Sequence, residues 1–410
     1  MIRSAAASFI VPGGVEAGAA RVLVARALRS FGDGYVAVLL PAYLLALGFG
    51  EIDIGILGTV TLFGSAMATL SLGAFGNRVP EHRLLAAAAF LMILTGVGFA
   101  GLSTFWPLLI VAFFGTLNPS GGDVTVFLPL EHARLAASSS GDSRTALFAR
   151  YSLAGSLAGA LGALAAALPE WVSSLTDVGP LECMRVMFWL YALIGIAVWL
   201  LYREAPRDQR LPLAAQAPLG KSRAIVLKLA ALFSVDAFAG GLLVHSLLAL
   251  WLFQRFGMSL TAAAAFFFWT GLLSAGSQLA AAPIARRFGL LNTMVYTHIP
   301  SSAFLIAAAL SPSVEVALAF LLLRSALSQM DVPTRSAYVM AVVTPPERPA
   351  AASFTAVPRS LAAAAGPALT GVMFSAGALA APLIACGVLK IGYDLALLAA
   401  FKRVAPNLEN

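Results

Sequence analysis

The chain has 410 residues, of which 60% are hydrophobic and 11% are charged, against about 45–50% and about 25% in ordinary soluble proteins. With a mean hydropathy of +0.88, the apolar side chains are too numerous to be buried in a water-soluble core. The composition therefore excludes a disordered chain, a secreted disulfide scaffold and, despite the net charge of +7, a soluble nucleic-acid-binding protein. The sequence predicts an all-α integral membrane protein.

A membrane-spanning helix needs about 20 consecutive, mostly apolar residues, and twelve stretches of the chain meet that requirement. They cover residues 28–48, 54–75, 84–103, 107–128, 146–168, 186–202, 230–252, 260–283, 290–310, 316–340, 352–374 and 379–400. A polar linker at 203–229 divides them into two six-helix halves, 28–202 and 230–400. We expect residues 1–27 to be a lead-in and residues 401–410 a tail.

The basic residues between the spans lie mostly on one side of the membrane, whereas the opposite loops hold only Arg185 and Arg255. By the positive-inside rule, the lead-in, the linker and the tail are cytoplasmic. We therefore predict a multi-pass protein of the inner or plasma membrane with both termini in the cytoplasm. Its basic loops are expected to contact anionic lipid head groups, so membrane lipid is a predicted partner.

The two halves resemble each other at a nearly constant offset, which indicates an internal duplication. Arg78 and Arg287 stand 209 residues apart, Asp123 and Asp331 208 apart, and Arg150 and Arg359 209 apart. All of these residues lie beside or inside predicted spans.

Twelve spans in two parallel halves with a basic central linker resemble the major facilitator superfamily of secondary transporters. Residues 73–83, GAFGNRVPEHR, are similar to the family's motif in the loop after its second span, with Asn77 in place of the motif's aspartate and Pro80 in place of its second glycine. Gly366 and Pro367 are similar to the small-residue motif of the proton-driven exporters. The resemblance implies two pseudo-symmetric six-helix bundles in a monomeric transporter that works by alternating access.

Two aspartates inside predicted spans are the candidate proton-coupling residues. A charge at the middle of a span costs about 2.5–3.5 kcal/mol on the insertion scale, so it needs a partner or a function. Asp33 has Arg29 four residues earlier, and either Arg29 simply neutralises it or Asp33 takes up and releases a proton. Asp236 has no cation three or four residues away in the sequence. We expect its charge to be poorly compensated, which makes Asp236 the first candidate.

A polar stripe inside the span 316–340 is the candidate substrate-binding surface. At about 100° per residue, one face of a continuous helix presents Arg324, Ser328, Asp331 and Arg335. Arg324 lies near the middle of the span, and its counterpart in the first half is Thr116. Two interpretations stay open: Arg324 pairs with a carboxylate of another helix, or it binds a carboxylate or phosphate of the substrate. Arg324, Ser328 and Thr116 are the predicted substrate-binding residues.

A third set of charges lies near the cytoplasmic ends of the spans. By resemblance to the family, these aspartates and arginines latch the cytoplasmic side closed when the substrate cavity opens outward. The predicted gating residues are Arg78, Asp123, Arg150, Arg287, Asp331 and Arg359.

Several polar residues are predicted to have structural roles only. We expect Lys390 and Asp394, four residues apart on one helix, to satisfy each other. His298 lies in a span that the family places at the periphery. The Glu81-His82 and Glu131-His132 pairs are expected to face the cytoplasm, and they lack the ligand set of a metal site.

These observations favour a transporter over an enzyme, because the sequence has no nucleophile–base pair, no metal cluster and no Walker motif. We predict no cofactor and no nucleic-acid partner. The first hypothesis is the export of small amphipathic or drug-like compounds in exchange for protons. The second is transport of an organic anion that carries a carboxylate or phosphate, bound by Arg324. A membrane receptor that does not transport is a more remote alternative.

Overall fold

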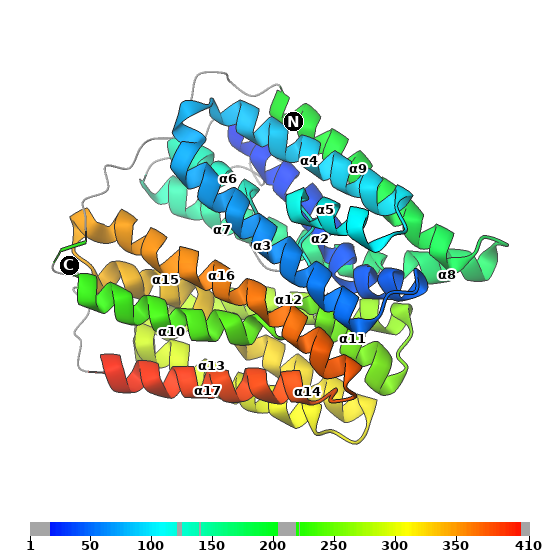
Figure 1. Ribbon diagram of the computed structural model, residues 1–410. Helices are drawn as coiled ribbons and strands as arrows, with labels where there is room; N and C mark the ends of the chain where they lie inside the picture. The colour runs from blue at the N-terminus through cyan, green and yellow to red at the C-terminus, as the bar shows by residue number, and fades with distance from the viewer. Residues whose placement is uncertain (1–16, 121–124, 139–140, 204–218, 221, 403–410) are drawn as a thin grey trace, which may run out of the picture. The chain divides into compact units, whose positions relative to one another are not determined.

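The computed structural model describes residues 17–120, 125–138, 141–203, 219–220 and 222–402. Within these ranges every regular element is a helix (Figure 1). Eight helical segments of this part of the chain are long and apolar enough to cross a membrane. The prediction of an all-α membrane protein is therefore confirmed.

The first half of the chain contains eight α-helices among the described residues. They are α2 (Ala17–Ala46), α3 (Glu51–Phe75), α4 (Glu81–Gly101), α5 (Phe105–Phe114), α6 (Phe127–Ala137), α7 (Gly141–Ala165), α8 (Leu168–Leu175) and α9 (Pro180–Arg203). Helix α2 begins at Ala17, inside the predicted lead-in, because Val22, Leu23 and Ala25 are buried against the other helices and extend its apolar face.

The second half also contains eight described α-helices. They are α10 (Arg223–Gly241), α11 (His245–Phe256), α12 (Leu260–Phe288), α13 (Leu290–Ala309), α14 (Val314–Leu327), α15 (Asp331–Val342), α16 (Arg348–Ser375) and α17 (Ala381–Phe401). A short 3₁₀ turn, Pro345–Glu347, precedes α16.

Three predicted spans are interrupted rather than continuous helices. In the span 107–128, α5 ends at Phe114 and α6 begins only at Phe127; the span 230–252 consists of α10 and α11, and the span 316–340 of α14 and α15. At the first break Gly115 leaves the helix with ψ 179°, and at the second Val244 is extended with ψ 157°. The third break, at 328–330, lies between Arg324 and Asp331, so these two residues belong to different helices.

Contacts between Cα atoms divide the chain into two compact units. Unit 1 comprises residues 1–49, 64–212 and 260–268, and unit 2 comprises residues 50–63, 213–259 and 269–410. Each unit therefore includes a short segment from the other half of the sequence.

Within unit 2, the beginning of α3 packs closely on α16. A Cβ atom added to Gly55 would lie 2.6 Å from the carbonyl oxygen of Pro367, and one added to Gly371 would lie 2.5 Å from that of Glu51. The Ala368 N–H also donates to the Thr59 hydroxyl over 2.9 Å. Only glycine permits this backbone approach, which explains why residues 50–63 group with unit 2.

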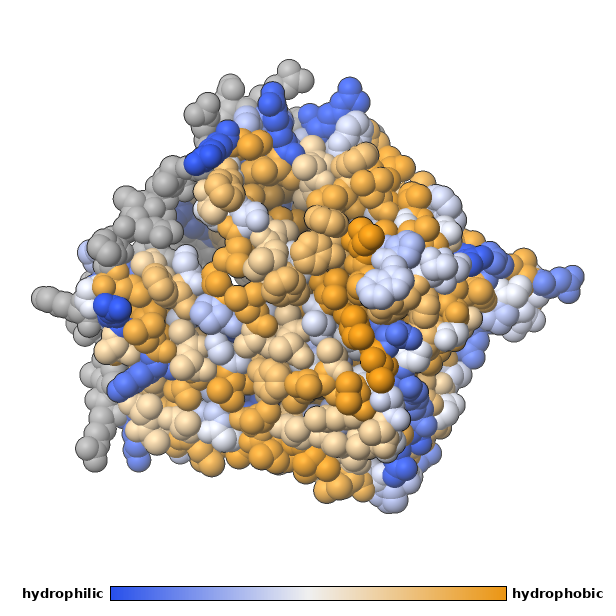
Figure 2. Space-filling view, in the orientation of Figure 1, coloured by the Kyte–Doolittle hydropathy of each residue, from blue (hydrophilic) through white to orange (hydrophobic). Residues whose placement is uncertain are grey.

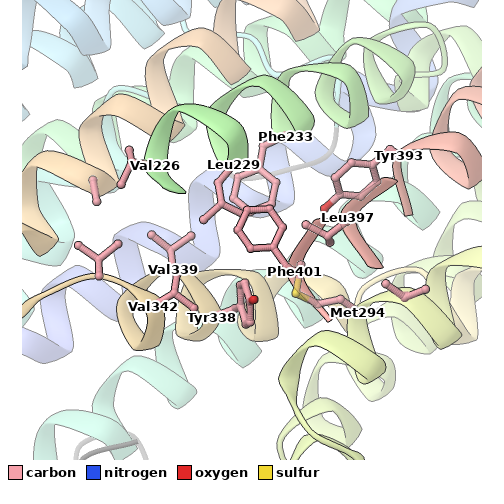
Figure 3. Packing of buried hydrophobic residues seen from close by; sticks show 13 residues of the cluster. Val226, Leu229, Phe233, Met294, Tyr338, Val339, Val342, Tyr393, Leu397 and Phe401 are labelled. Carbon is pink, nitrogen blue, oxygen red and sulfur yellow. The ribbon is translucent and has the colours of Figure 1, made fainter. Parts of the chain in front are cut away.

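Each unit has its own apolar core. In unit 2, side chains of α10, α13, α15 and α17 pack around Phe233, Tyr338 and Phe401 (Figure 3). In unit 1, Val22 and Leu23 of α2 pack with Leu135, Leu147 and Tyr151 of α6 and α7.

Hydrophobic side chains also cover much of the visible surface (Figure 2). On α5, Trp106 is 72% exposed, Ile110 62% and Phe114 64%. Exposing such a continuous apolar surface to water is unfavourable, whereas contact with lipid acyl chains is not. These faces are therefore suited to contact with lipid.

Candidate functional site

The main candidate site is a network of buried charges inside unit 2, centred on Asp236 of α10. Asp236 is 3% exposed. Its Oδ1 lies 2.6 Å from Lys390 Nζ of α17, and its Oδ2 lies 2.9 Å from Arg335 Nη2 of α15. The expectation that Asp236 is poorly compensated was therefore wrong. Its cations come from two other helices, and the residue spacing along its own helix could not reveal them.

Arg335 joins a second carboxylate to this network. The same Nη2 donates to Asp331 Oδ2, one helical turn away on α15. The guanidinium also stacks over the Phe233 ring, with Cζ 5.3 Å from the ring centroid. Arg335 is thus held between two aspartates and an aromatic face, an arrangement that suits a planar, permanently charged group. This contact confirms that Asp331 and Arg335 share a face of α15.

His298 of α13 extends the network on its other side. His298 Nδ1 lies 2.9 Å from Asp394 Oδ2, and Nε2 lies 3.5 Å from Lys390 Nζ and 3.9 Å from Asp236 Oδ1. His298 is 5% exposed and Asp394 1%. The expectation that Lys390 and Asp394 satisfy each other was wrong, because Lys390 turns to Asp236 and Asp394 turns to His298. Discounting His298 was also wrong, because α13 packs directly against α17.

The formal charges of these contacting groups do not balance when His298 is neutral. Three carboxylates, Asp236, Asp331 and Asp394, face two cations, Lys390 and Arg335, which leaves one negative charge. Arg359, which is exposed on α16, supplies a third positive charge that acts on Arg335, Asp236 and Asp331 without contacting them.

Unit 1 contains a second buried network, centred on Glu131 of α6. Glu131 is fully buried and accepts hydrogen bonds from Arg29 Nη2 and the Tyr151 hydroxyl, each over 2.5 Å, and from the Tyr202 hydroxyl. The four side chains come from α2, α6, α7 and α9. Sequence reasoning missed Glu131 because it was placed at the cytoplasmic surface. A carboxylate flanked by Leu128, Leu130 and Leu135 was the available signal.

Arg29 therefore pairs with Glu131, and the interpretation in which it only neutralises Asp33 finds no ion pair between the two in the described part of the chain. Asp33 is half-buried on α2, where the Tyr191 hydroxyl lies 3.4 Å from its Oδ1. The Tyr191 hydroxyl also donates to the carbonyl oxygen of Thr116 over 3.1 Å and lies 3.3 Å from the Thr116 hydroxyl. Tyr191 thus links two residues that the sequence had placed in different roles.

Arg324 of α14 is a half-buried cation with no carboxylate in contact among the described residues. The interpretation of Arg324 as a clamp to a carboxylate of another helix therefore finds no partner in this part of the chain. Ser328 follows at the end of α14, where its N–H donates to the Arg324 carbonyl oxygen over 2.9 Å.

The predicted gating residues are distributed over both units. Arg78 and Arg287 are exposed at the ends of their helices and lie over the rings of Phe75 and Phe288. Arg150 is half-buried on α7, Arg359 is exposed on α16, and Asp331 belongs to the unit 2 network. Asp123 lies outside the described residues.

Comparison with known proteins places this architecture in a family. The sequence matches the profile of the Major Facilitator Superfamily over residues 22–327, about three quarters of the chain. The chain belongs to the major facilitator superfamily. An uncharacterized membrane protein of Saccharomyces cerevisiae is 26% identical over 412 residues, covering 91% of this chain and 92% of its own.

Solved structures of this superfamily have the same fold. A bacterial homolog of the human lysosomal transporter Spinster aligns with a TM-score of 0.73 at 16% identity, covering 94% of this chain and 96% of its own. A D-xylose-proton symporter aligns with a TM-score of 0.73 at 16% identity, covering 95% and 98%. The human organic anion transporter MFSD10 (TETRAN) aligns with a TM-score of 0.65 at 19% identity, covering 92% and 98%.

Membership in the superfamily confirms the predicted fold class. The protein is a multi-pass membrane transporter rather than an enzyme. The buried networks are therefore features of a secondary transporter.

Proposed function

We propose that the protein is a proton-coupled secondary transporter of a small organic solute and that the unit 2 network is its coupling site. The observation that carries the proposal is the contact of a histidine with two buried carboxylates and a lysine: His298 lies 2.9 Å from Asp394 Oδ2, 3.5 Å from Lys390 Nζ and 3.9 Å from Asp236 Oδ1. Imidazole is the side chain that ordinarily titrates near neutral pH. His298 is thus the residue of this network that binds the coupled proton.

The hydrogen bonds around His298 define two states of the network. In the neutral state Nδ1–H donates to Asp394, and Nε2 faces the Lys390 ammonium over 3.5 Å as an acceptor. In the protonated state Nε2 becomes a donor, so it repels Lys390 and attracts Asp236. Protonation therefore makes His298 compete with Lys390 for the same carboxylate oxygen.

The distances give the size of this competition. With an effective dielectric constant of about 20, a charged His298 is attracted to Asp236 at 3.9 Å by about 4 kcal/mol and repelled by Lys390 at 3.5 Å by about 5 kcal/mol. These two terms nearly cancel. Asp394, at 2.9 Å, contributes about 6 kcal/mol of attraction. Asp394 is thus the strongest of the three interactions with a charged His298.

Protonation matters for transport because it weakens the Asp236–Lys390 contact between α10 and α17. Helices that lose an ion pair can shift to a second arrangement, and a solute that prefers one arrangement is then coupled to the proton. Asp236 remains the hub of the coupling site in this proposal. Asp33, held by Tyr191 beside Thr116, is the candidate for a second coupling residue in unit 1.

The decisive experiment measures solute accumulation in proteoliposomes under an imposed pH gradient. A panel of labelled amphipathic cations, neutral solutes and carboxylates is first screened by exchange at equal pH to find a transported probe. His298→Gln should retain exchange but lose gradient-driven accumulation, because glutamine cannot carry the proton. His245→Gln, which removes a histidine elsewhere in unit 2, is the matched control. Normal accumulation by His298→Gln would overturn the proposal.

A second proposal concerns the charge of the solute. Arg324 has no carboxylate partner among the described residues, which favours a solute that supplies one. A similarly folded protein, MFSD10, is an organic anion transporter, which agrees with this hypothesis. In the exchange screen, selection of carboxylates over amphipathic cations would support the anion hypothesis. The opposite selection would support the export of amphipathic compounds.

The sequence predicts proton-driven export, in which a lower pH outside the cell drives protons inward and the solute outward. Proteoliposomes sorted by protein orientation, with the pH clamped on each side, test the direction of net movement. Export requires accumulation against the solute gradient only when the face that is extracellular in cells is acidic. Accumulation in the opposite sense would indicate uptake.

We propose that both termini and the linker at 203–229 face the cytoplasm of a cell whose inner or plasma membrane holds the protein. Single cysteines introduced at Arg83 and Lys402 should react with an impermeant maleimide only after the cells are opened. A cysteine at Glu170 should react in intact cells. Reaction of the Lys402 site in intact cells would invert the topology.

We also propose that Arg78, Asp123, Arg150, Arg287, Asp331 and Arg359 take part in closing the cytoplasmic side. Asp331→Asn is the informative variant, because Asp331 also holds Arg335. If Asp331 is a gate, the variant should shift the resting population of conformers, measured by cysteine accessibility, without changing proton coupling. Loss of coupling with no conformational shift would assign Asp331 to the coupling site alone.

A further inference from the structure

A cleft outside both buried networks lies where α4 begins and α9 ends, within unit 1. Its volume is about 690 Å³, and it is lined by Pro80, His82, Arg83, Ala86, Trp199 and Arg203. Two arginines, a histidine and a tryptophan thus face one small opening.

The glycines of α4 and α9 explain why these residues lie together. A Cβ atom on Gly96 would lie 2.5 Å from the Ala192 nitrogen, and one on Gly195 would lie 3.0 Å from the Ile93 nitrogen. The two helices therefore pack with their backbones close along their length. This packing brings the first turn of α4 beside the last turn of α9, where the chain direction places Arg83 near Arg203.

Among the described residues that line the cleft, two are arginines and none is a carboxylate. Glu81, beside His82 in the sequence, is buried and lies 3.7 Å from Arg134 Nη1. Arg203 Cζ lies 5.4 Å from the Trp199 ring centroid, and the side chain of Arg203 is exposed. The first turn of α4 adds the positive end of the helix dipole.

The arginines at the cleft are suited to a phosphate oxygen. Arg83 and Arg203 are both exposed, and a guanidinium donates charge-assisted hydrogen bonds to phosphate. His82, which also lines the cleft, is half-buried.

Apolar surface continues from this cleft along both helices. Phe90 is seven residues after Arg83 on α4, and Ile196 is seven residues before Arg203 on α9, so each shares a helix face with its arginine. Phe90 is 53% exposed and Ile196 40%. A ligand with a phosphate at the cleft and hydrocarbon below it would match both surfaces.

We propose that this cleft binds the phosphodiester head group of an anionic phospholipid. Arg83 and Arg203 contact the phosphate, and Trp199 lies at the level of the glycerol backbone. The acyl chains run along Phe90 and Ile196. This assignment is independent of the proposed proton coupling.

The test uses the fluorescence of Trp199 and lipids brominated near the top of the acyl chain, which quench tryptophan on contact. The full-length protein is reconstituted in mixed vesicles of phosphatidylglycerol and phosphatidylcholine, with bromine on one lipid or the other. The Trp199 signal is the difference between wild type and Trp199→Phe. It should be quenched more strongly when phosphatidylglycerol carries the bromine.

Arg83→Ala combined with Arg203→Ala should abolish this preference for brominated phosphatidylglycerol. In 0.5 M salt the preference should weaken, because the Debye length falls to about 4 Å and the attraction between the arginines and the phosphate is screened. Arg286→Ala combined with Arg287→Ala, which removes two exposed arginines at the end of α12, is the matched control and should retain the preference. Equal quenching by both brominated lipids in the wild type would overturn the proposal. Loss of the preference in 20 mM inorganic phosphate would also overturn it, by assigning the cleft to a soluble phosphate.

Discussion

Replacing Glu131 by glutamine is a sharp test of how the unit 1 network stabilises the protein. Glu131 is fully buried and accepts hydrogen bonds from Arg29, Tyr151 and Tyr202. Glutamine has nearly the same shape but no charge, and its amide group turns a donor toward groups that are themselves donors. The variant thus leaves Arg29, which is 2% exposed, without its counter-charge.

The distance between Arg29 and Glu131 sets the magnitude. At 2.5 Å and an effective dielectric constant of about 20, their attraction is about 7 kcal/mol. Part of this only offsets the cost of taking both charges out of water. Removing one partner of a buried pair typically costs about 3–5 kcal/mol, because the remaining charge stays buried. We expect Glu131→Gln to destabilise the protein by that amount.

The measurement is thermal unfolding of the purified protein in a single detergent, and the matched control is Glu182→Gln. Glu182 forms an ion pair of similar length, 2.6 Å, with Arg185, but its side chain is 57% exposed. An exposed pair contributes about 0–1 kcal/mol, so the control should unfold near the wild-type temperature.

A double variant, Arg29→Met with Glu131→Gln, removes the uncompensated cation and should recover part of the loss. The reasoning would be refuted if Glu131→Gln were no less stable than Glu182→Gln. It would also be refuted if the double variant lost more stability than the two single variants lose when their losses are added.

Three further predictions concern unit 2. Asp394→Asn removes the anion 2.9 Å from His298, so gradient-driven accumulation should fall at least about tenfold while exchange at equal pH is retained; unchanged accumulation would contradict the role of Asp394. Arg324→Ala should weaken binding of a carboxylate probe at least about tenfold, measured by equilibrium binding, whereas Arg324→Lys should retain more of it; equal affinities would contradict the anion hypothesis. Glu347, outside the spans, accepts hydrogen bonds from Ser222 and Gly220, which lower its pKa from 4.5 to about 2; because the folded-state pKa is lowered, this stabilisation is present above about pH 4.5 and is lost as the pH falls through 2. Glu347→Gln should therefore lower the unfolding temperature at pH 7, and the difference from wild type should disappear near pH 2.

The sequence by itself determined the class of the protein and most of its membrane helices. A span is a local property, because about 20 adjacent apolar residues are enough to cross the membrane. The cost of a charge in that environment also marks Asp33, Asp236 and Arg324 as unusual from their position in apolar stretches alone. The repeated positions of basic residues and the loop motif at 73–83 indicated the family.

The breaks within the predicted spans could not be predicted from the hydropathy of the sequence. Hydropathy averages over a window, and the residues of the break at 242–244 are as apolar as those of the helices beside it. Val244 is extended at that break, a conformation that its apolar side chain does not reveal. A helix-face projection fails wherever such a break lies between its residues.

Only the tertiary structure decided which charges are partners. Within one helix a side chain reaches positions three or four residues away, and that rule found Asp331 and Arg335 but wrongly paired Lys390 with Asp394. Asp236 obtains its cations from α15 and α17, and Glu131 obtains its donors from α2, α7 and α9. Such partners come from the packing of separate helices, where a shift of one turn or a rotation of one face exchanges one neighbour for another. Inside the membrane there is no water to stabilise a charge, so the neighbouring side chains must do so. The packing of the helices therefore determines the partner of each charged residue.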